Sequence, residues 1–416
     1  MERTLRRNSL GTTNFARNSA DVVAQNGWLR PLLWLTLATS SYVVVEPAPY
    51  DLLLIGLAVC FFSTGLKVPG ALGSGALLLA IFLIGNLAGT LTGGHGDDSV
   101  RALSIRIYML FAWLLFASVV AERPDRNMRI IWSGYVCAAL IAVVWGVGQY
   151  YALIPGELTG PTRRATGGFK DANVFAPFLV PIALLSLAHV YHARGARLLV
   201  TIGCFLLLNL GILVAFSRGA WLNLLASCGF LCLLLLIARS PRRQKLNFVL
   251  MLVVVVTAGF AALFLAVNYT DAGQMFAQRS ALVQAYDVAA GGRFDSQLRA
   301  IELIGQTPLG AGAGMADEVL GIQPHNIYLQ VTLEGGWLAG ISFVGFLGLT
   351  IVRGLRHIRR PGQALDINVL VALAGLLGVL LQSAFIDSTH WRHMWLLIAI
   401  VWGLTATQTR PLDRSH

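Results

Sequence analysis

The stretch PHNIYLQVTLEGGWLAGISFVGFLGLTIV, residues 324–352, decides the fold of this chain. From residue 326 onward it is one apolar run, longer than the roughly 17–25 residues with which a helix crosses a bilayer. Apolar and polar residues do not alternate with a period of two, so the run predicts a helix and not a barrel strand. Because a long polar segment ends directly before it in Pro324-His325-Asn326, we expect a histidine at the rim of a helix bundle.

Eleven further apolar segments occur along the 416 residues. The chain is 56% hydrophobic and 12% charged, with a mean hydropathy of +0.68, which argues against a soluble domain. Because helices satisfy their own backbone hydrogen bonds in lipid, the sequence predicts an all-α polytopic membrane protein with about 12 transmembrane helices. The predicted spans are 28–46, 50–66, 72–93, 104–121, 129–152, 174–193, 197–216, 220–238, 247–267, 326–352, 365–386 and 392–408.

Lysine and arginine are distributed unequally between the two sets of connections. The set that includes both termini carries 21 of the 31 cations, and the alternate set carries the other 10. The positive-inside rule therefore predicts cytoplasmic termini and a periplasmic segment 268–325. The same bias explains the net charge of +11, so the basic balance indicates topology and not nucleic-acid binding.

The predicted organisation is one helix bundle with one long loop. We expect a cytoplasmic tail at 1–27, nine transmembrane helices within 28–267, a periplasmic loop region with short amphipathic helices at 268–325, three more transmembrane helices within 326–408, and a cytoplasmic tail at 409–416. All five cysteines fall inside apolar segments, where packing is the expected role, so no disulfide framework and no thiolate metal site is predicted.

A loop at residues 153–173 contains three cations, Arg163, Arg164 and Lys170, followed by Asp171. Three cations in an outer loop run against the positive-inside bias, so topology does not explain them. Glycines in the loop could let the cations close over an anion, which makes the four residues candidates for substrate binding. In the alternative reading, the loop is an ordinary solvated connection in which Asp171 caps the next helix.

Two more arginines stand at turns on the same predicted side. Arg218 lies in the tight turn FSRGAW, residues 216–221, where it could bind a phosphate beside a helix N-terminus or serve as an interfacial anchor. Arg293 opens a predicted amphipathic helix that would lie on the membrane or on the bundle, and it could equally be a solvated charge opposite an apolar stripe. That stripe consists of Phe294, Leu298 and Ile301.

His325 is reached through the run PLGAGAG, residues 308–314. These glycines match no dinucleotide-binding pattern and are interpreted as allowing a close approach to the membrane surface. A neutral imidazole can accept a proton from an alcohol, so His325 is a candidate general base, although a helix-capping or interfacial role is also open. Glu334 lies about 14 Å further down the predicted helix and is interpreted as a structural carboxylate or a proton acceptor.

The last predicted outer turn, residues 387–393, holds Asp387, His390 and Arg392. The spacing of Asp387, His390 and His393 spreads their side chains around a helix, so we predict neither a metal site nor a cofactor. Arg392 is a candidate for a further contact with an anion, and Asp387 and His390 are candidates for substrate binding.

Taken together, these features resemble the O-antigen ligase and O-antigen polymerase family of integral-membrane glycosyltransferases. The resemblance covers essentially the whole chain, because the order, spacing and predicted sidedness of the motifs match as well as their residues. The motifs that carry it are GGFKDANVFAPFL at 167–179, FSRGAWL at 216–222, GGRFDSQLRAIELI at 291–304, PLGAGAG at 308–314, PHNIYLQVTLEGG at 324–336 and DSTHWRHMW at 387–395.

The resemblance implies transfer of a glycan from undecaprenyl diphosphate to a hydroxyl at the periplasmic face of the bacterial inner membrane. By family position, Arg218 and Arg293 would bind the donor diphosphate and His325 would activate the acceptor hydroxyl, without a cation. A one-step displacement of this kind predicts inversion at the anomeric carbon.

Three functions stay open at this stage. A ligase uses a lipid A–core sugar as acceptor and is preferred, because the loop is moderate in length and the histidine lies directly at a helix start. A polymerase joins lipid-linked repeat units with the same motifs. An anion or lipid transporter would place its ionisable groups near the midplane of the membrane, where only Glu334 is predicted. The glycan, the acceptor sugar and the oligomeric state do not follow from the sequence.

Overall fold

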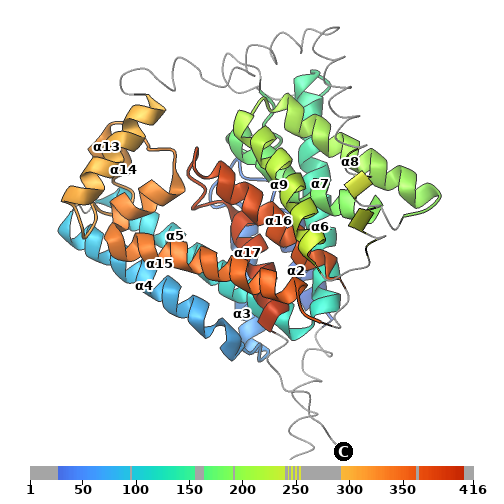
Figure 1. Cartoon of the computed structure of the whole chain (residues 1–416), viewed down its shortest axis with the longest axis horizontal. Coiled ribbons are helices and arrows are strands. Elements are labelled where there is room, and N and C mark those ends of the chain that lie inside the picture. The colour runs from blue at the N-terminus through green and yellow to red at the C-terminus, as the bar shows by residue number, and fades with distance from the viewer. Residues whose placement is uncertain are drawn as a thin grey trace, which may run out of the picture.

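The computed structural model describes residues 27–93, 96–154, 164–190, 193–238, 292–361 and 365–406, together with positions 242, 245–246, 249–250 and 253. The elements of this part of the chain are all helices (Figure 1). The predicted all-α class of a polytopic membrane protein is therefore confirmed.

Seven helices are long and apolar enough to cross a membrane in the described part of the chain. Their bounds are α4 Gly73–Thr92, preceded by the 3-10 turn η1 Gly70–Leu72, α5 Asp97–Glu122, α6 Pro124–Tyr150, α7 Ala172–Val190, α8 Ala196–Val214, α9 Arg218–Ile237 and α15 Ile327–Ile358.

Four further apolar helices are shorter: α2 Leu29–Ala38, α3 Pro49–Ser63, α16 Ile367–Gln382 and α17 Arg392–Ala406. Eleven of the twelve predicted segments thus coincide with an apolar helix, but four of these helices are shorter than a full span. The predicted span 247–267 lies outside the described residues except for the helical positions 249–250 and 253.

Polar side chains define where three of these helices begin. Ser217 caps α9 by accepting a hydrogen bond from Ala220 N, and Asp366 caps α16 by accepting from Asn368 N and Val369 N. Asn326 caps α15 in the same way. A side-chain oxygen at this position satisfies backbone donors that have no partner inside the helix, which explains why the apolar runs start where they do.

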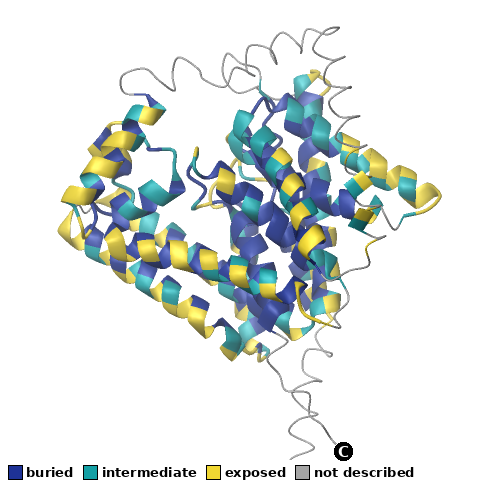
Figure 2. Ribbon diagram, viewed as in Figure 1, coloured by how far each residue is buried: buried dark blue, intermediate teal, exposed yellow. Residues whose placement is uncertain are grey.

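The core lies where the helices pack in pairs. α15 packs on α4, α17 on α5, α16 on α9, and α7 on α8. Figure 2 shows the buried residues concentrated in the middle of the bundle, around α16 and α17. Trp113 of α5 meets Phe346 and Trp402 edge-on at centroid distances of 5.3 and 5.5 Å, a favourable geometry for aromatic rings. Gly75 gives the ring of Trp402 room, because a Cβ there would lie 2.7 Å from it.

The predicted loop region is described from residue 292 onward and contains two helices, α13 Arg293–Gln306 and α14 Ala316–Leu320. α13 begins at Arg293, as predicted, and packs on α15, where Ala300 and Ile304 share a buried cluster with Leu333. Its predicted apolar stripe points the other way. Leu298 is 67% exposed and Ile301 is 57% exposed, so this stripe does not lie on the bundle.

α15 is interrupted at Gly336, which has φ +69° and ψ −175°. The glycine run 308–314 inserts its backbone at this break. Gly312 N donates to Glu334 O at 3.0 Å, and Trp337 N donates to Pro308 O at 3.1 Å, so groups left open by the break are satisfied. A Cβ on Gly310, where φ is +97°, would lie 2.5 Å from Glu334 O. The close approach made by these glycines is therefore to α15.

Candidate active site

His325 lies two residues before α15 in a strained backbone conformation. Its φ is +46°, a left-handed value that is uncommon for a residue with a Cβ. The residues that follow it are fixed, because the Asn326 side chain accepts hydrogen bonds from Tyr328 N and Leu329 N at 3.0 and 3.2 Å. Ile327 N donates to Ser383 O at 2.9 Å, which ties the start of α15 to the segment after α16.

Charged groups from four separate parts of the chain act on His325. Burial lowers its pKa, and the positive charge of Arg293 lowers it further, while the carboxylates of Asp317, Asp387 and Asp171 act in the opposite direction. The structure thus brings the predicted residues Arg293, Asp387 and Asp171 into the neighbourhood of His325. A lowered pKa keeps the half-buried ring neutral near pH 7, the form that can accept a proton.

The helices that carry Arg218 and Arg293 meet at one short segment, residues 382–384. Gly219, next to Arg218, packs on the Gln382 side chain, which also accepts a hydrogen bond from Asn223 of α9 at 2.9 Å. From α13, Gln297 donates to Ala384 O at 3.3 Å. Since Ile327 N also binds Ser383 O, residues 382–384 join the helix starts of α9, α13 and α15. Arg218 and Arg293 are each the first residue of their helix.

Arg164 and Asn173 form a junction with the turn before α9. The Arg164 guanidinium donates to Ala215 O at 2.8 Å and to Asn173 Oδ1 at 2.7 Å. The Ser217 hydroxyl donates to the same Asn173 oxygen at 2.8 Å. Arg164 therefore holds the turn that contains Arg218 against the start of α7. This structural role exists whether or not Arg164 also contacts the substrate.

The other candidates of this loop are placed differently. Lys170 is exposed and pairs with Glu46 at 2.9 Å. Asp171 stands directly before α7, where its carboxylate accepts a hydrogen bond from Asn173 N at 2.9 Å. Asp171 thus has the predicted capping position, and its negative charge also raises the pKa of His325. Arg163 lies outside the described residues.

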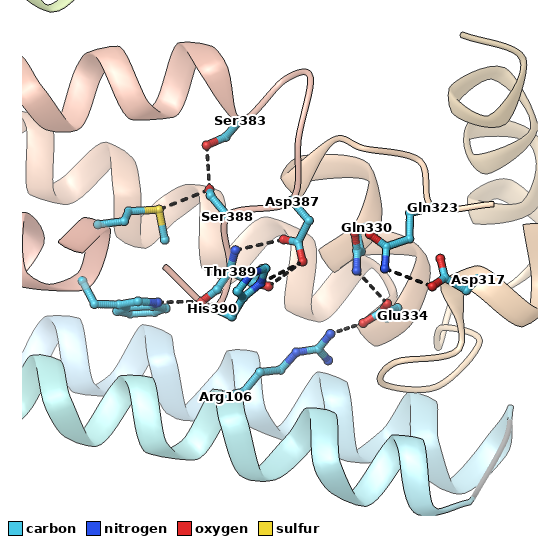
Figure 3. A network of polar contacts seen from close by, with 12 residues as sticks. Arg106, Asp317, Gln323, Gln330, Glu334, Ser383, Asp387, Ser388, Thr389 and His390 are labelled. Atoms are coloured by element: carbon cyan, nitrogen blue, oxygen red, sulfur yellow. Dashed lines mark hydrogen bonds and ion pairs between the residues drawn. The ribbon is translucent and has the colours of Figure 1, made fainter. Parts of the chain in front are cut away.

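Asp387 is held in a turn of its own. Its carboxylate accepts from the backbone and hydroxyl of Thr389, both at 2.9 Å, and lies 3.6 Å from His390 Nδ1 (Figure 3). Burial raises the pKa of Asp387, but the interactions with His390 and Thr389 outweigh burial and hold the pKa below its usual value. Asp387 is thus a fixed negative charge, and it raises the pKa of His325.

Arg392, a candidate anion contact, has a carboxylate partner. Its guanidinium donates to both oxygens of Asp51, at 3.0 and 2.7 Å, and Tyr108 donates to the same carboxylate at 2.7 Å. An anion at this point would have to compete with Asp51. A carboxylate at the start of a predicted span marks Asp51 as unusual. Its partner Arg392 is 341 positions away, so the sequence does not predict the pair.

A buried polar network joins α4, α5 and α15, and the sequence did not predict its pairing. Arg106 of α5 pairs with Glu334 of α15 and also donates to Asn86 of α4 (Figure 3). Gln330 donates to the other Glu334 oxygen at 3.2 Å. Arg106 lies near the start of the predicted span 104–121, and its side chain is only 7% exposed inside α5. A charged residue within an apolar run often has a functional or structural partner, so the position of Arg106 in the sequence could have identified it as a candidate.

Possible metal ligands do not gather within the described ranges, where no three His, Cys, Asp or Glu side chains form a candidate cation site. Asp387 and His390 approach each other, but His393 does not join them. It is buried, with its ring stacked on Trp391 at 5.2 Å.

Residues 202–344 match the family model described as O-antigen ligase. This match confirms the resemblance inferred from the motifs. It covers about a third of the chain and includes Arg218, Arg293, His325 and Glu334. The family implies a membrane transferase that acts on lipid-linked glycans. A search of curated proteins found no match.

Proposed function

We propose that this chain is an O-antigen ligase that transfers a glycan from undecaprenyl diphosphate to a sugar hydroxyl of lipid A–core. The observation that carries the proposal is that the helix following His325 meets the helices that begin at Arg218 and Arg293 at residues 382–384. All three residues lie in the segment that matches the family. No metal or cofactor has a step in this proposal.

The donor diphosphate would be held by Arg218 and Arg293. Both residues open a helix, so an anion bound by either arginine would also be favoured by the backbone N–H groups of that helix start. As the bond from the sugar to the diphosphate breaks, negative charge grows on the leaving group. Preorganised donors aimed at that charge lower the barrier, and the loss of one such donor typically costs about 10²–10³ in rate.

His325 would act as the general base. The acceptor hydroxyl oxygen attacks the anomeric carbon, its proton passes to the imidazole, and the bond from that carbon to the diphosphate oxygen breaks. A positioned base contributes about 10²–10⁴ in rate. Attack opposite the leaving group gives inversion at the anomeric carbon.

The proposed location is the bacterial inner membrane, with cytoplasmic termini and a periplasmic site. Ion pairs between the predicted outer connections support their lying at the same end of the helix bundle. Glu46 pairs with both Lys170 and Arg101, and Asp51 pairs with Arg392. The three connections that precede α3, α5 and α7 thus meet, as does the one before α17.

A polymerase remains the second candidate, since the family includes both activities and the same residues would serve. The two differ in the acceptor, which for a polymerase is another lipid-linked repeat unit. A transporter is less well supported, because Glu334 is paired with Arg106 and is not an open carboxylate.

The deciding experiment uses the full chain in lipid nanodiscs with undecaprenyl-diphosphate-linked glycan and lipid A–core. We expect His325→Ala to bind the donor but to lose transfer by at least about 10²-fold, because binding is assigned to the arginines. His189→Ala is the matched control, since His189 lies in the last turn of α7 and hydrogen-bonds Leu185 O at 2.7 Å. Full transfer by His325→Ala would remove this residue from the mechanism. Transfer only to a second lipid-linked repeat unit would identify a polymerase.

A further inference from the structure

The segment that carries His325 is closed at its base. Ala311 N donates to Leu333 O at 2.8 Å, and Gly312 N donates to Glu334 O at 3.0 Å. The chain between these two pairs leaves the bundle, forms α14, turns at His325 and returns as the first turns of α15. We call residues 311–334 the His325 loop. Its two ends are held together by backbone hydrogen bonds beside the break at Gly336.

The buried ion pair lies at this base. Glu334 is bound through its backbone oxygen to the glycine run and through its side chain to Arg106. Arg106 lies about 14 Å along α5 from Asp97, the first residue of that helix. The side chains of Arg106 and Glu334 are 7% and 1% exposed. The pair is therefore buried inside the bundle.

The guanidinium of Arg106 contacts two helices at once. One terminal nitrogen donates to Asn86 of α4 and the other to Glu334 of α15, while Gln330 donates to the second Glu334 oxygen. Asn86 is itself fixed by donating to Phe82 O at 2.8 Å. The planar fork of arginine sets the angle between these partners, which the ammonium group of lysine does not reproduce.

Stability alone is a weak reason for such a pair. Removing two charges from water costs several kcal/mol, and replacement of buried ion pairs by apolar residues is often neutral or stabilising. Ionisable groups inside membrane helices are rare for the same reason, and those that occur tend to have functional roles. Here the pair holds the base of the loop whose apex is the proposed base His325.

We propose that Arg106, acting through Glu334, is a positioning residue that sets where His325 stands relative to the donor arginines. This inference rests on the proposed role of His325 in glycan transfer. From Glu334 back to Ile327 the chain is continuous helix, so a rotation or shift at the ion pair is transmitted about 10 Å to the start of α15. Misplacement of a reacting group by about 1 Å can cost 10²-fold in rate.

The test removes both charges together, because removal of one leaves the other buried without compensation. We expect Arg106→Met/Glu334→Met to insert and to bind donor with an unchanged KM, and to lose about 10²-fold in kcat. The acid limb of its pH profile should also move, since the ring changes its distance from Arg293, Asp317, Asp387 and Asp171. If the double Met variant does not fold, Arg106→Gln/Glu334→Gln retains hydrogen-bonding side chains and the same expectation applies.

The matched control is Arg353→Met. Arg353 belongs to α15 beyond the break, where it donates to Thr405 and to Ala71 O, so its loss should leave the pH profile of transfer in place. Arg106→Lys should insert but should not reach the wild-type kcat, because lysine lacks the planar fork of arginine.

Wild-type kcat and an unmoved acid limb in the double variant would overturn the positioning role while leaving the proposed function intact. Full transfer by His325→Ala would instead remove the proposed base itself. The two failures are therefore distinguishable.

Discussion

His325 combines a strained backbone with a lowered pKa. The left-handed φ of +46° turns the chain sharply between Pro324 and the capped start of α15. Conformations of this kind persist where the surrounding contacts hold them, and they concentrate at functional sites. Burial and Arg293 both favour the neutral ring, whereas Asp387 moderates the effect. The balance among these charges should be visible in the pH dependence of transfer.

The charge of Arg293 gives a pH prediction with a definite sign. Its positive charge disfavours the protonated ring, so Arg293→Gln should raise the pKa of His325. Because only the neutral ring can act as base, the acid limb of the rate profile should move to higher pH, and the rate should fall by about 10²–10³. Residual transfer by the purified variant, measured across pH, is the readout.

Arg299→Gln is the control for this prediction. Arg299 is exposed on the same helix and pairs with Asp295 at 2.6 Å, so its loss should leave the acid limb in place. A limb that stays fixed or moves to lower pH in Arg293→Gln would show that Arg293 does not act on His325 in this way.

At the scale of elements, α15 and the glycine run 308–314 form one unit. The helix breaks at Gly336, and the inserted backbone satisfies the groups that the break leaves open. A Cβ on Gly336 would lie 2.4 Å from Pro308 O, and one on Gly89 of α4 would lie 2.4 Å from Glu334 O. The backbones of α4, α15 and the glycine run therefore approach one another so closely that a Cβ at these glycines would clash.

This packing predicts that Gly310→Ala destabilises the fold. The added Cβ would lie 2.5 Å from both Glu334 O and Gly336 N, at a φ of +97° that alanine rarely adopts. The expected loss is about 1–3 kcal/mol, measured as a lower Tm in detergent. Gly305→Ala in α13 is the control, since nothing lies within 4 Å of its Cβ, and its Tm should not fall. An unchanged Tm for Gly310→Ala would contradict the described insertion.

In the molecule as described, contacts at residues 382–384 join the starts of the helices that carry Arg218 and Arg293 and the start of the helix that follows His325. Asp51 and Glu46 bind cations from other connections. The opposite end of α15 has its own contacts, such as His357 with Asp366 at 3.2 Å. This arrangement agrees with the alternation of connections on which the predicted sidedness depends.

The proposed orientation predicts the labelling of single cysteines. Glu302→Cys on α13 should react with a membrane-impermeant maleimide when only the outer membrane is permeabilised. Arg359→Cys, after α15, should react only once the inner membrane is opened. Both positions are exposed, and the natural cysteines lie in apolar helices, so the unmodified protein serves as the background. Reaction of the two positions in the reverse order would invert the topology.

Much of the bundle follows from local sequence. Runs of apolar residues predict helices because backbone groups in lipid must be satisfied within the segment, and each of α2 to α9 and α15 to α17 overlaps one of these runs. The ends are less well predicted, since α2 ends at Ala38 and not at 46, and α5 begins at Asp97 and not at 104. Asn326 and Ser217 mark helix starts through short-range capping. Arg218, Arg293 and His325 could be identified as candidates because each is a polar residue at the edge of an apolar or amphipathic segment.

Only the tertiary structure decides which distant residues meet. Arg106 and Glu334 are separated by 228 positions, and Asp51 and Arg392 by 341, so no local pattern relates them. The direction of the α13 stripe and the insertion of the glycine run at Gly336 likewise depend on neighbouring helices. Hydropathy reports the preference of each segment for lipid, whereas the pairing of buried charges is a property of two segments packed together.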